Sequence, residues 1–253
     1  MKKQLLALST TLVLTAAALA GTKPEVTLDF NKESSVAFEN GAALGPEGSG
    51  VSGKSGDRAY VAKGTIGSTD PQPGAIVQDM MFDDLDKMTL TFWYKADDAL
   101  AQNASLLNFG GAYMIWDGKS GWTARLGGKT DKPFGSWVRI GEKGPVGPWS
   151  ATGEWIFGAI SWNSETKTAT VYQGAKDGAA TLQRAFANMP IEGNIGGGTV
   201  GMIGNTQQPK VNPPMPSDRP FSGSIDNVNV FRAELSESEI EAVRAAGVEN
   251  KTP

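Results

Sequence analysis

The sequence predicts an all-β protein, an antiparallel β-sandwich of the jelly-roll type with one short C-terminal helix. Three observations predict this fold class. Apolar and polar residues alternate in several short segments, turn-forming residues that include 32 glycines separate these segments, and a helix start occurs only near the end of the chain. Because strands do not alternate with helices, a βαβ architecture is excluded and an antiparallel sandwich remains.

The N-terminus has the features of a secretory signal peptide over residues 1–20. Two lysines precede a short apolar run, and Ala18-Leu19-Ala20 supplies the small residues of a signal peptidase site. The run is too short to cross a bilayer comfortably, and no cysteine follows it that a lipid could modify. We therefore expect an exported chain, periplasmic, on the cell surface or secreted, with no membrane insertion after cleavage.

Residues 24–247 are predicted to form one sandwich domain, followed by a tail at 248–253. The clearest strand is 88–95, in which side chains 88, 90, 92 and 94 share the face expected to line the core. A polar turn at 163–167 joins two further strands into a hairpin. The other strands expected from their composition are 26–30, 104–109, 154–162, 168–172, 199–204 and 224–231.

One helix is expected, and it begins after Ser236. Ser236 and Glu239 have capping-box spacing, and Ile240 and Val243 supply an apolar stripe. Gly247 stands where a C-cap glycine is expected, so the sequence predicts that the helix ends there.

Composition excludes several classes of function. The net charge is −4 and basic residues do not cluster, so nucleic acid and anionic membranes are poor partners. The absence of cysteine means that the core, and not disulfides, must hold the fold together. The absence of histidine removes Ser/His/Asp and Cys/His catalysis and imidazole-based metal sites.

The order of segments resembles the laminin G-like, concanavalin A-like jelly-roll superfamily of lectins and glucanases. The most specific stretch is FSGSIDNVNVFRAELSESEI at 221–240, since that family has a strand reading F-x-G-x-I-D-x-V-x-V before a turn and Ser-x-x-Glu-Ile. The matching residues are Phe221, Gly223, Ile225, Asp226, Val228, Val230, Phe231, Arg232, Leu235, Ser236, Glu239 and Ile240. The segment 111–150 matches nothing in this pattern.

The resemblance implies a sandwich shape that serves adhesion, lectin activity and catalysis alike. Glucanases of this superfamily carry an acid triad, E-x-D-x-x-E or E-x-D-x-E, along one strand. No expected strand here has that pattern. We therefore expect a protein that is not an enzyme, with a glycoside hydrolase as the less favoured alternative.

Asp226 lies in the last strand, with the same parity as Val228 and Val230. If these valines point into the sandwich, its carboxylate also points inward and must be hydrogen-bonded or bound to a cation. We favour a structural acceptor for loop N–H groups, with Asp29 as a candidate structural neighbour. Calcium bound by Asp226 is the alternative, since related jelly rolls carry calcium at the sandwich rim, but one aspartate is far short of the roughly six to eight oxygens that calcium takes. No cofactor is required.

Tryptophan is the remaining candidate for recognition. The chain has seven tryptophans and four tyrosines, and four of these tryptophans fall between residues 111 and 150, beside polar and charged residues. Aromatic faces beside hydrogen-bonding groups are what sugar rings stack on, whereas packing in the core is the ordinary role of tryptophan. The candidate ligand-binding residues are Trp116, Asp117, Trp122, Arg125 and Trp149.

Two functions remain ahead of hydrolysis. The first is an exported module that recognises carbohydrate or a glycan-bearing surface through loops of a rigid sandwich. The second is a structural or adhesive cell-envelope protein whose partner is another protein. The exposure of the tryptophans distinguishes the two, because buried indoles favour the second.

Overall fold

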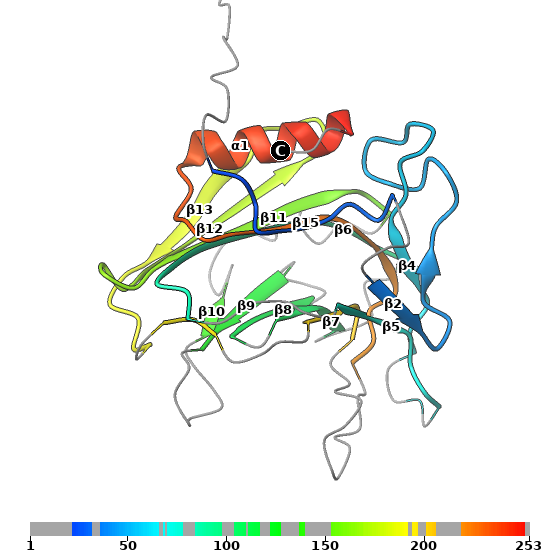
Figure 1. Cartoon of the computed structure of the whole chain (residues 1–253), viewed down its shortest axis with the longest axis horizontal. Coiled ribbons are helices and arrows are strands. Elements are labelled where there is room, and N and C mark those ends of the chain that lie inside the picture. The colour runs from blue at the N-terminus through cyan, green and yellow to red at the C-terminus, as the bar shows by residue number, and fades with distance from the viewer. Residues whose placement is uncertain are drawn as a thin grey trace, which may run out of the picture.

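The computed structural model shows two antiparallel sheets stacked face to face, with one helix outside them (Figure 1). The structure describes residues 22–31, 36–65, 68, 70–77, 84–97, 104–109, 111–116, 122–127, 137–139, 153–191, 194–196, 201–205 and 219–250, without the side chains of 116, 137–139 and 182–184. The predicted signal peptide lies outside this part of the chain. None of the described helices is long and apolar enough to span a bilayer.

The larger sheet has eight strands, and its centre is formed by the strands that the sequence predicts most clearly. In spatial order it contains β13 (Thr181–Phe186), β12 (Thr168–Ala175), β11 (Ile156–Asn163), β6 (Lys87–Ala96), β15 (Gly223–Phe231), β4 (Tyr60–Ala62) and β3 (Ala43–Leu44), and β1 (Val26–Leu28) pairs with β15 beyond the end of β4. The predicted hairpin is confirmed as the antiparallel pair β11 and β12.

The smaller sheet has seven strands and contains most of the elements that the sequence analysis did not assign. Its order is β10 (Trp137–Arg139), β9 (Trp122–Leu126), β8 (Ala112–Trp116), β7 (Ala104–Asn108), β14 (Gly201–Ile203), β5 (Gly74–Val77) and β2 (Val36–Glu39). Strands β8, β9 and β10 form a meander within the unmatched segment 111–150.

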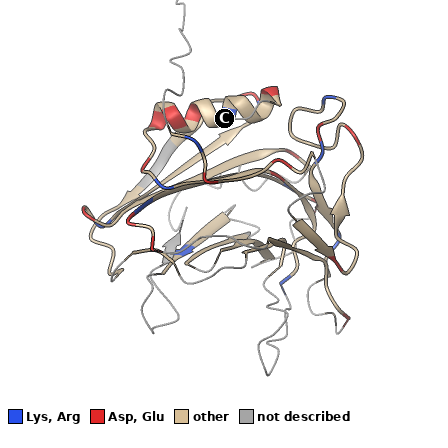
Figure 2. Ribbon diagram, in the orientation of Figure 1, with Lys and Arg blue, Asp and Glu red and all other residues tan. Residues whose placement is uncertain are grey.

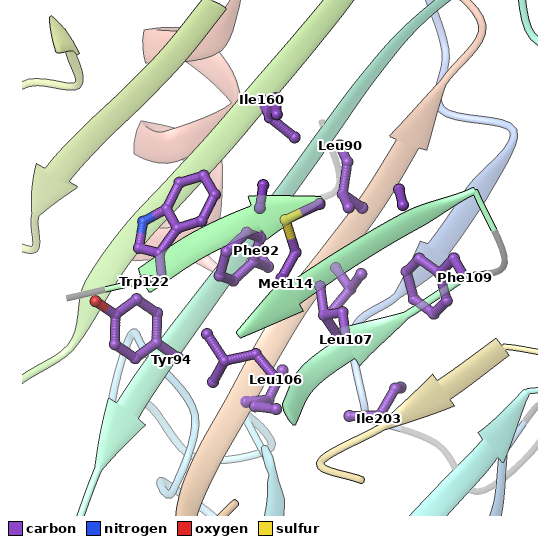
Figure 3. Packing of buried hydrophobic residues seen from close by; sticks show 14 of the residues in the cluster. Leu90, Phe92, Tyr94, Leu106, Leu107, Phe109, Met114, Trp122, Ile160 and Ile203 are labelled. Atoms are coloured by element: carbon purple, nitrogen blue, oxygen red, sulfur yellow. The ribbon is translucent and has the colours of Figure 1, made fainter. Parts of the chain in front are cut away.

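The main core fills the space between the two sheets. The even-numbered residues of β6, from Met88 to Tyr94, are fully buried there, as the alternation predicts. Figure 3 shows Phe92 and Tyr94 beside Trp122 of the opposite sheet, and the rings of Phe92 and Trp122 meet edge to face with centroids 5.1 Å apart.

A second, smaller core lies on the opposite face of the larger sheet, beneath α1 (Glu237–Glu249). Trp93, Phe157 and Phe231 point to this side and pack against Ile240 and Val243 of the helix. Figure 1 shows α1 lying across this outer face. Trp93, which alternation directs away from the main core, is therefore buried by the helix.

The helix begins as predicted and ends later than predicted. Both halves of the capping box between Ser236 and Glu239 are present. The C-cap is Asn250, which has the left-handed conformation at φ 54°, so the prediction that Gly247 ends the helix is wrong. Gly247 lies inside the helix, and glycine is required there because a Cβ atom would come within 2.8 Å of Trp93 Nε1.

Replacing Gly247 with alanine is expected to destabilise the protein by about 1–3 kcal/mol, because the overlap with Trp93 exceeds the gain of about 1 kcal/mol in helix propensity. The measurement is urea unfolding monitored by circular dichroism. Gly178→Ala is the matched control, since the nearest atom lies 4.0 Å from its added Cβ. A stability of Gly247→Ala equal to or above that of wild type would contradict this packing.

Candidate functional site

Asp226 lies on the outer face of the larger sheet, so the expectation that it points between the sheets is wrong. A β-bulge between Asp226 and Asn229 adds a residue to β15, and Asn227 takes the left-handed conformation at φ 46°. The bulge breaks the two-residue alternation on which that expectation was based. Asp226 therefore faces the same side as its cross-strand partner Trp93, while Val228 returns to the main core.

The carboxylate of Asp226 is fully buried and accepts two backbone hydrogen bonds. Val51 N–H donates to Oδ2 at 2.9 Å, and Asn227 N–H donates to Oδ1 at 2.7 Å. Burial raises the pKa of Asp226 well above its ordinary value, and the nearby charges of Asp57 and Asp29 raise it further, while the two N–H donors oppose these effects. Asp226 thus connects the last strand to the loop at residues 45–58.

The loop contains a buried carboxylate of its own, Asp57, which the sequence analysis does not identify. Its Oδ2 accepts hydrogen bonds from Ser52 N–H at 2.8 Å and Ser52 Oγ–H at 2.6 Å. Gly50 permits this arrangement, because a Cβ atom there would lie 2.3 Å from the Asp57 carboxyl carbon. Asp29 is half-buried and accepts from Asn31 N–H, so it is a neighbour of Asp226 and shares no hydrogen bond with it.

The same loop also reaches the C-terminal end of α1. Lys54 Nζ donates to the carbonyl oxygen of Glu249 at 3.0 Å, although the last turn of the helix has no basic residue of its own. Asn31 Nδ2 donates to Asn250 Oδ1 at 3.3 Å, and Asn31 Oδ1 accepts from Arg58 N–H. The loop, the end of β1 and the helix C-terminus are thus held together around Asp226.

Calcium fits this arrangement poorly. Each oxygen of Asp226 accepts one N–H donor and keeps one further lone pair, so Asp226 could supply at most two of the roughly six to eight oxygens that calcium takes. Within the described ranges, no three Asp or Glu side chains are grouped so that they could hold a metal ion. The observed donors match the structural role that the sequence favours for Asp226.

Of the predicted ligand-binding residues, the structure describes the side chains of Trp122 and Arg125, and these two point to opposite faces of the smaller sheet. Trp122 is fully buried in the main core, whereas Arg125, three residues later on β9, faces the outside of the smaller sheet. Trp116 ends β8 as the cross-strand partner of Trp122, but its side chain lies outside the described residues. Asp117 and Trp149 also lie outside them.

Arg125 is instead the centre of a row across three strands. It is directly opposite Tyr113 of β8 on one side and Trp137 of β10 on the other, so all three residues belong to the outer face of the smaller sheet. Directly opposite residues have Cβ atoms about 4.5–5.5 Å apart. Asn108 of β7 pairs with Tyr113 and extends the row.

The row is polar, aromatic and cationic. Tyr113 and Arg125 are half-buried, and burial lowers the pKa of Arg125 while the neighbouring Tyr113 opposes that shift. Glu39 of β2, at the far edge, is the one acidic residue in the described strands of this sheet. Figure 2 shows how few charged residues this sheet carries. The described side chains of Tyr113 and Arg125 place an aromatic ring beside guanidinium donors.

Tyr113, Trp137 and Asn108 were missed as members of a site, although the sequence contains a signal for them. AYMIW at 112–116 and WTARL at 122–126 both alternate with period two. Reading these segments as neighbouring strands would have separated Trp122 from Arg125 and placed Tyr113 on the face of Arg125. The register that brings in Trp137 depends on a turn that the sequence does not specify.

A family model described as the concanavalin A-like lectin/glucanases superfamily, of the laminin G type, matches residues 70–241. No curated protein matches the chain. The matched range includes β5 through the first part of α1, and with it both the row on the smaller sheet and the bulge at Asp226.

Solved structures with the same fold share little sequence with this chain. The binding domain of botulinum neurotoxin DC in complex with rat synaptotagmin II has 13% identity and a TM-score of 0.58, over 89% of this chain and 52% of that chain. The same binding domain in complex with SialylT has 12% identity and a TM-score of 0.56, over 84% and 46%. This chain thus spans about half the length of these structures.

A smaller domain is covered almost completely. Domain 4 of AbnA, a GH43 extracellular arabinanase from Geobacillus stearothermophilus, in complex with arabinotriose, has 15% identity and a TM-score of 0.54, over 88% of this chain and 98% of that chain. At these identities the similarities establish the fold. The structures compared are binding domains or domains seen with a bound ligand.

Asp226→Ala is expected to destabilise the protein by about 1–3 kcal/mol, because the buried N–H groups of Val51 and Asn227 lose their acceptor. The measurement is urea unfolding of the variant and of wild type, with and without calcium or EDTA. Asp70→Ala, at an exposed loop position, is the control. A wild-type stability that rises with calcium and falls with EDTA, or an unchanged stability of Asp226→Ala, would contradict the hydrogen-bond acceptor role.

Proposed function

The chain belongs to the concanavalin A-like lectin/glucanase superfamily, and we propose that it is an exported, non-catalytic binding module that recognises carbohydrate. The observation that supports this proposal best is the cross-strand pair of Tyr113 and Arg125 on the outer face of the smaller sheet. The ring of Tyr113 provides flat apolar surface for a sugar ring, and the guanidinium group of Arg125 can donate hydrogen bonds to sugar oxygens. The leader-like residues 1–20 support export.

The composition of this face favours binding over hydrolysis. Glycoside hydrolysis uses a pair of carboxyl groups on either side of the scissile bond. In the described strands that carry the row, β7 to β10, there is no aspartate or glutamate. The described side chains of this face supply hydrogen-bond donors and aromatic surface, which support the proposal of binding.

The alternative is that the outer face of the smaller sheet binds another protein. Trp122 is buried, so it cannot be one of the exposed aromatic residues that a carbohydrate site needs. Arg and aromatic residues are also enriched at the centres of protein interfaces. The carbohydrate proposal therefore rests on the row around Arg125, and its test has to centre on that residue.

Arg125→Gln is expected to weaken glycan binding about 10- to 100-fold, which corresponds to the loss of a charge-assisted hydrogen bond worth roughly 1.5–3 kcal/mol. The measurement is a glycan array with the chain that begins after residue 20, followed by calorimetry with the best ligand. Arg58→Gln is the matched control, because Arg58 belongs to the loop at residues 45–58, outside the smaller sheet.

Three outcomes would contradict the proposal. Wild-type protein that binds no glycan on the array would exclude carbohydrate recognition and favour the protein partner. Equal binding by Arg125→Gln and Arg58→Gln would remove the row from the site. Release of shorter oligosaccharides from a bound glycan would show that the protein is a hydrolase.

A further inference from the structure

Two facing strands of the two sheets, β9 and β12, direct polar groups into the main core that have no hydrogen-bond partner there. Trp122 points from β9 toward the larger sheet, where it meets Gly158 of β11. A Cβ atom at Gly158 would lie 3.0 Å from Trp122 Nε1 and 2.7 Å from Phe92, so Gly158 also faces the main core. Gln173 of β12 is directly opposite Gly158 and therefore points to the same side.

Gln173 is fully buried, and neither its amide oxygen nor its amide nitrogen has a hydrogen-bond partner. The Nε1–H group of Trp122 is also buried without a partner. Leaving one such group unpaired costs about 1–3 kcal/mol, so buried polar groups in proteins almost always have a partner, often an ordered water. Three unpaired polar atoms in one region of the core therefore indicate a missing polar partner.

Strand pairing places the Gln173 side chain next to the position on Gly158 that Trp122 Nε1 approaches. Cross-strand Cβ positions at directly opposite residues lie about 5 Å apart, so the Gln173 side chain starts about 5 Å from the Cβ position of Gly158. Trp122 Nε1 lies 3.0 Å from that same position. The glutamine amide and the indole nitrogen thus border one region on the inner face of β11 and β12.

We propose that Gln173 and Trp122 form an internal binding site for a neutral hydroxyl group. The site offers two kinds of N–H donor and one carbonyl acceptor, which matches a group that both donates and accepts. The surrounding side chains of Phe92 and Val171 are apolar, so they give an ion no compensating charge. The hydroxyl group belongs either to an ordered water or to a small sugar.

This inference is independent of the proposed function. The row around Arg125 lies on the outer face of the smaller sheet, whereas Trp122 and Gln173 face the interior. A loss of glycan binding at the row around Arg125 would not change the pairing of Gln173 and Trp122 in the interior. The two proposals therefore fail separately.

Gln173→Met tests whether the amide is paired, because methionine has a similar shape and no strong hydrogen-bonding group. If a hydroxyl group satisfies Gln173, the variant loses these bonds and its Tm falls by about 2–4 °C. If the amide is unpaired, removing it relieves an unfavourable burial and Tm stays the same or rises. The control is Gln72→Met, since the buried Gln72 accepts from Thr65 N–H and donates to the Asp70 carbonyl.

The second measurement uses wild-type protein and does not depend on the stability of a variant. In NMR spectra, the Trp122 indole proton, assigned through its contacts with Phe92, is expected to show cross-relaxation with a bound water, or to shift when L-arabinose or D-glucose is added. A water cross-peak that persists without a shift identifies water, and a shift identifies a sugar hydroxyl. The absence of both signals, or a Gln173→Met Tm at or above that of wild type, overturns the proposal.

Discussion

The bulge in the last strand is the constraint on which the arrangement of this protein depends. An extra residue at Asn227 turns Asp226 away from the sandwich interior and buries its carboxylate between the larger sheet and the loop at residues 45–58. A buried carboxylate requires donors, and Val51 of that loop provides one of them. The loop also contacts the C-terminal end of α1 through Lys54, while Ile240 and Val243 of the helix pack over Trp93 and close the second core.

Strand β9 of the smaller sheet carries both a core residue and a residue of the proposed binding site. Trp122 and Arg125 are three residues apart on β9, and strand geometry sends them to opposite faces. The inner face contributes the indole of Trp122 to the core and its N–H group to the proposed internal site. The outer face presents Arg125 between Tyr113 and the position of Trp137. A ligand on the outer face would meet a rigid row of cross-strand neighbours, because the main core fixes the strands beneath it.

Sequence analysis predicts the parts of this fold in which local pattern and tertiary structure agree. Alternation in β6 and β15 and the capping box at Ser236 identify the central strands and the helix start. The direction of Asp226 was predicted wrongly, because period-two reasoning assumes an unbroken strand, although Asp-Asn is a pair that tolerates a left-handed residue. Gly247 was mistaken for a helix end because its contact with Trp93 is tertiary. The row around Arg125 depends on strand register, which a single sequence specifies weakly.

Amide hydrogen exchange at Val51 tests the role of Asp226 most directly. The account predicts that the Val51 N–H group, although it belongs to a loop, exchanges about as slowly as the amides of β6, because its acceptor is buried and opens only with the sheet. In Asp226→Ala the same amide is predicted to exchange much faster, because it has lost its acceptor while the amides of β6 keep theirs. Fast exchange at Val51 in the wild-type protein would show that the carboxylate does not hold the loop, and it would contradict the account.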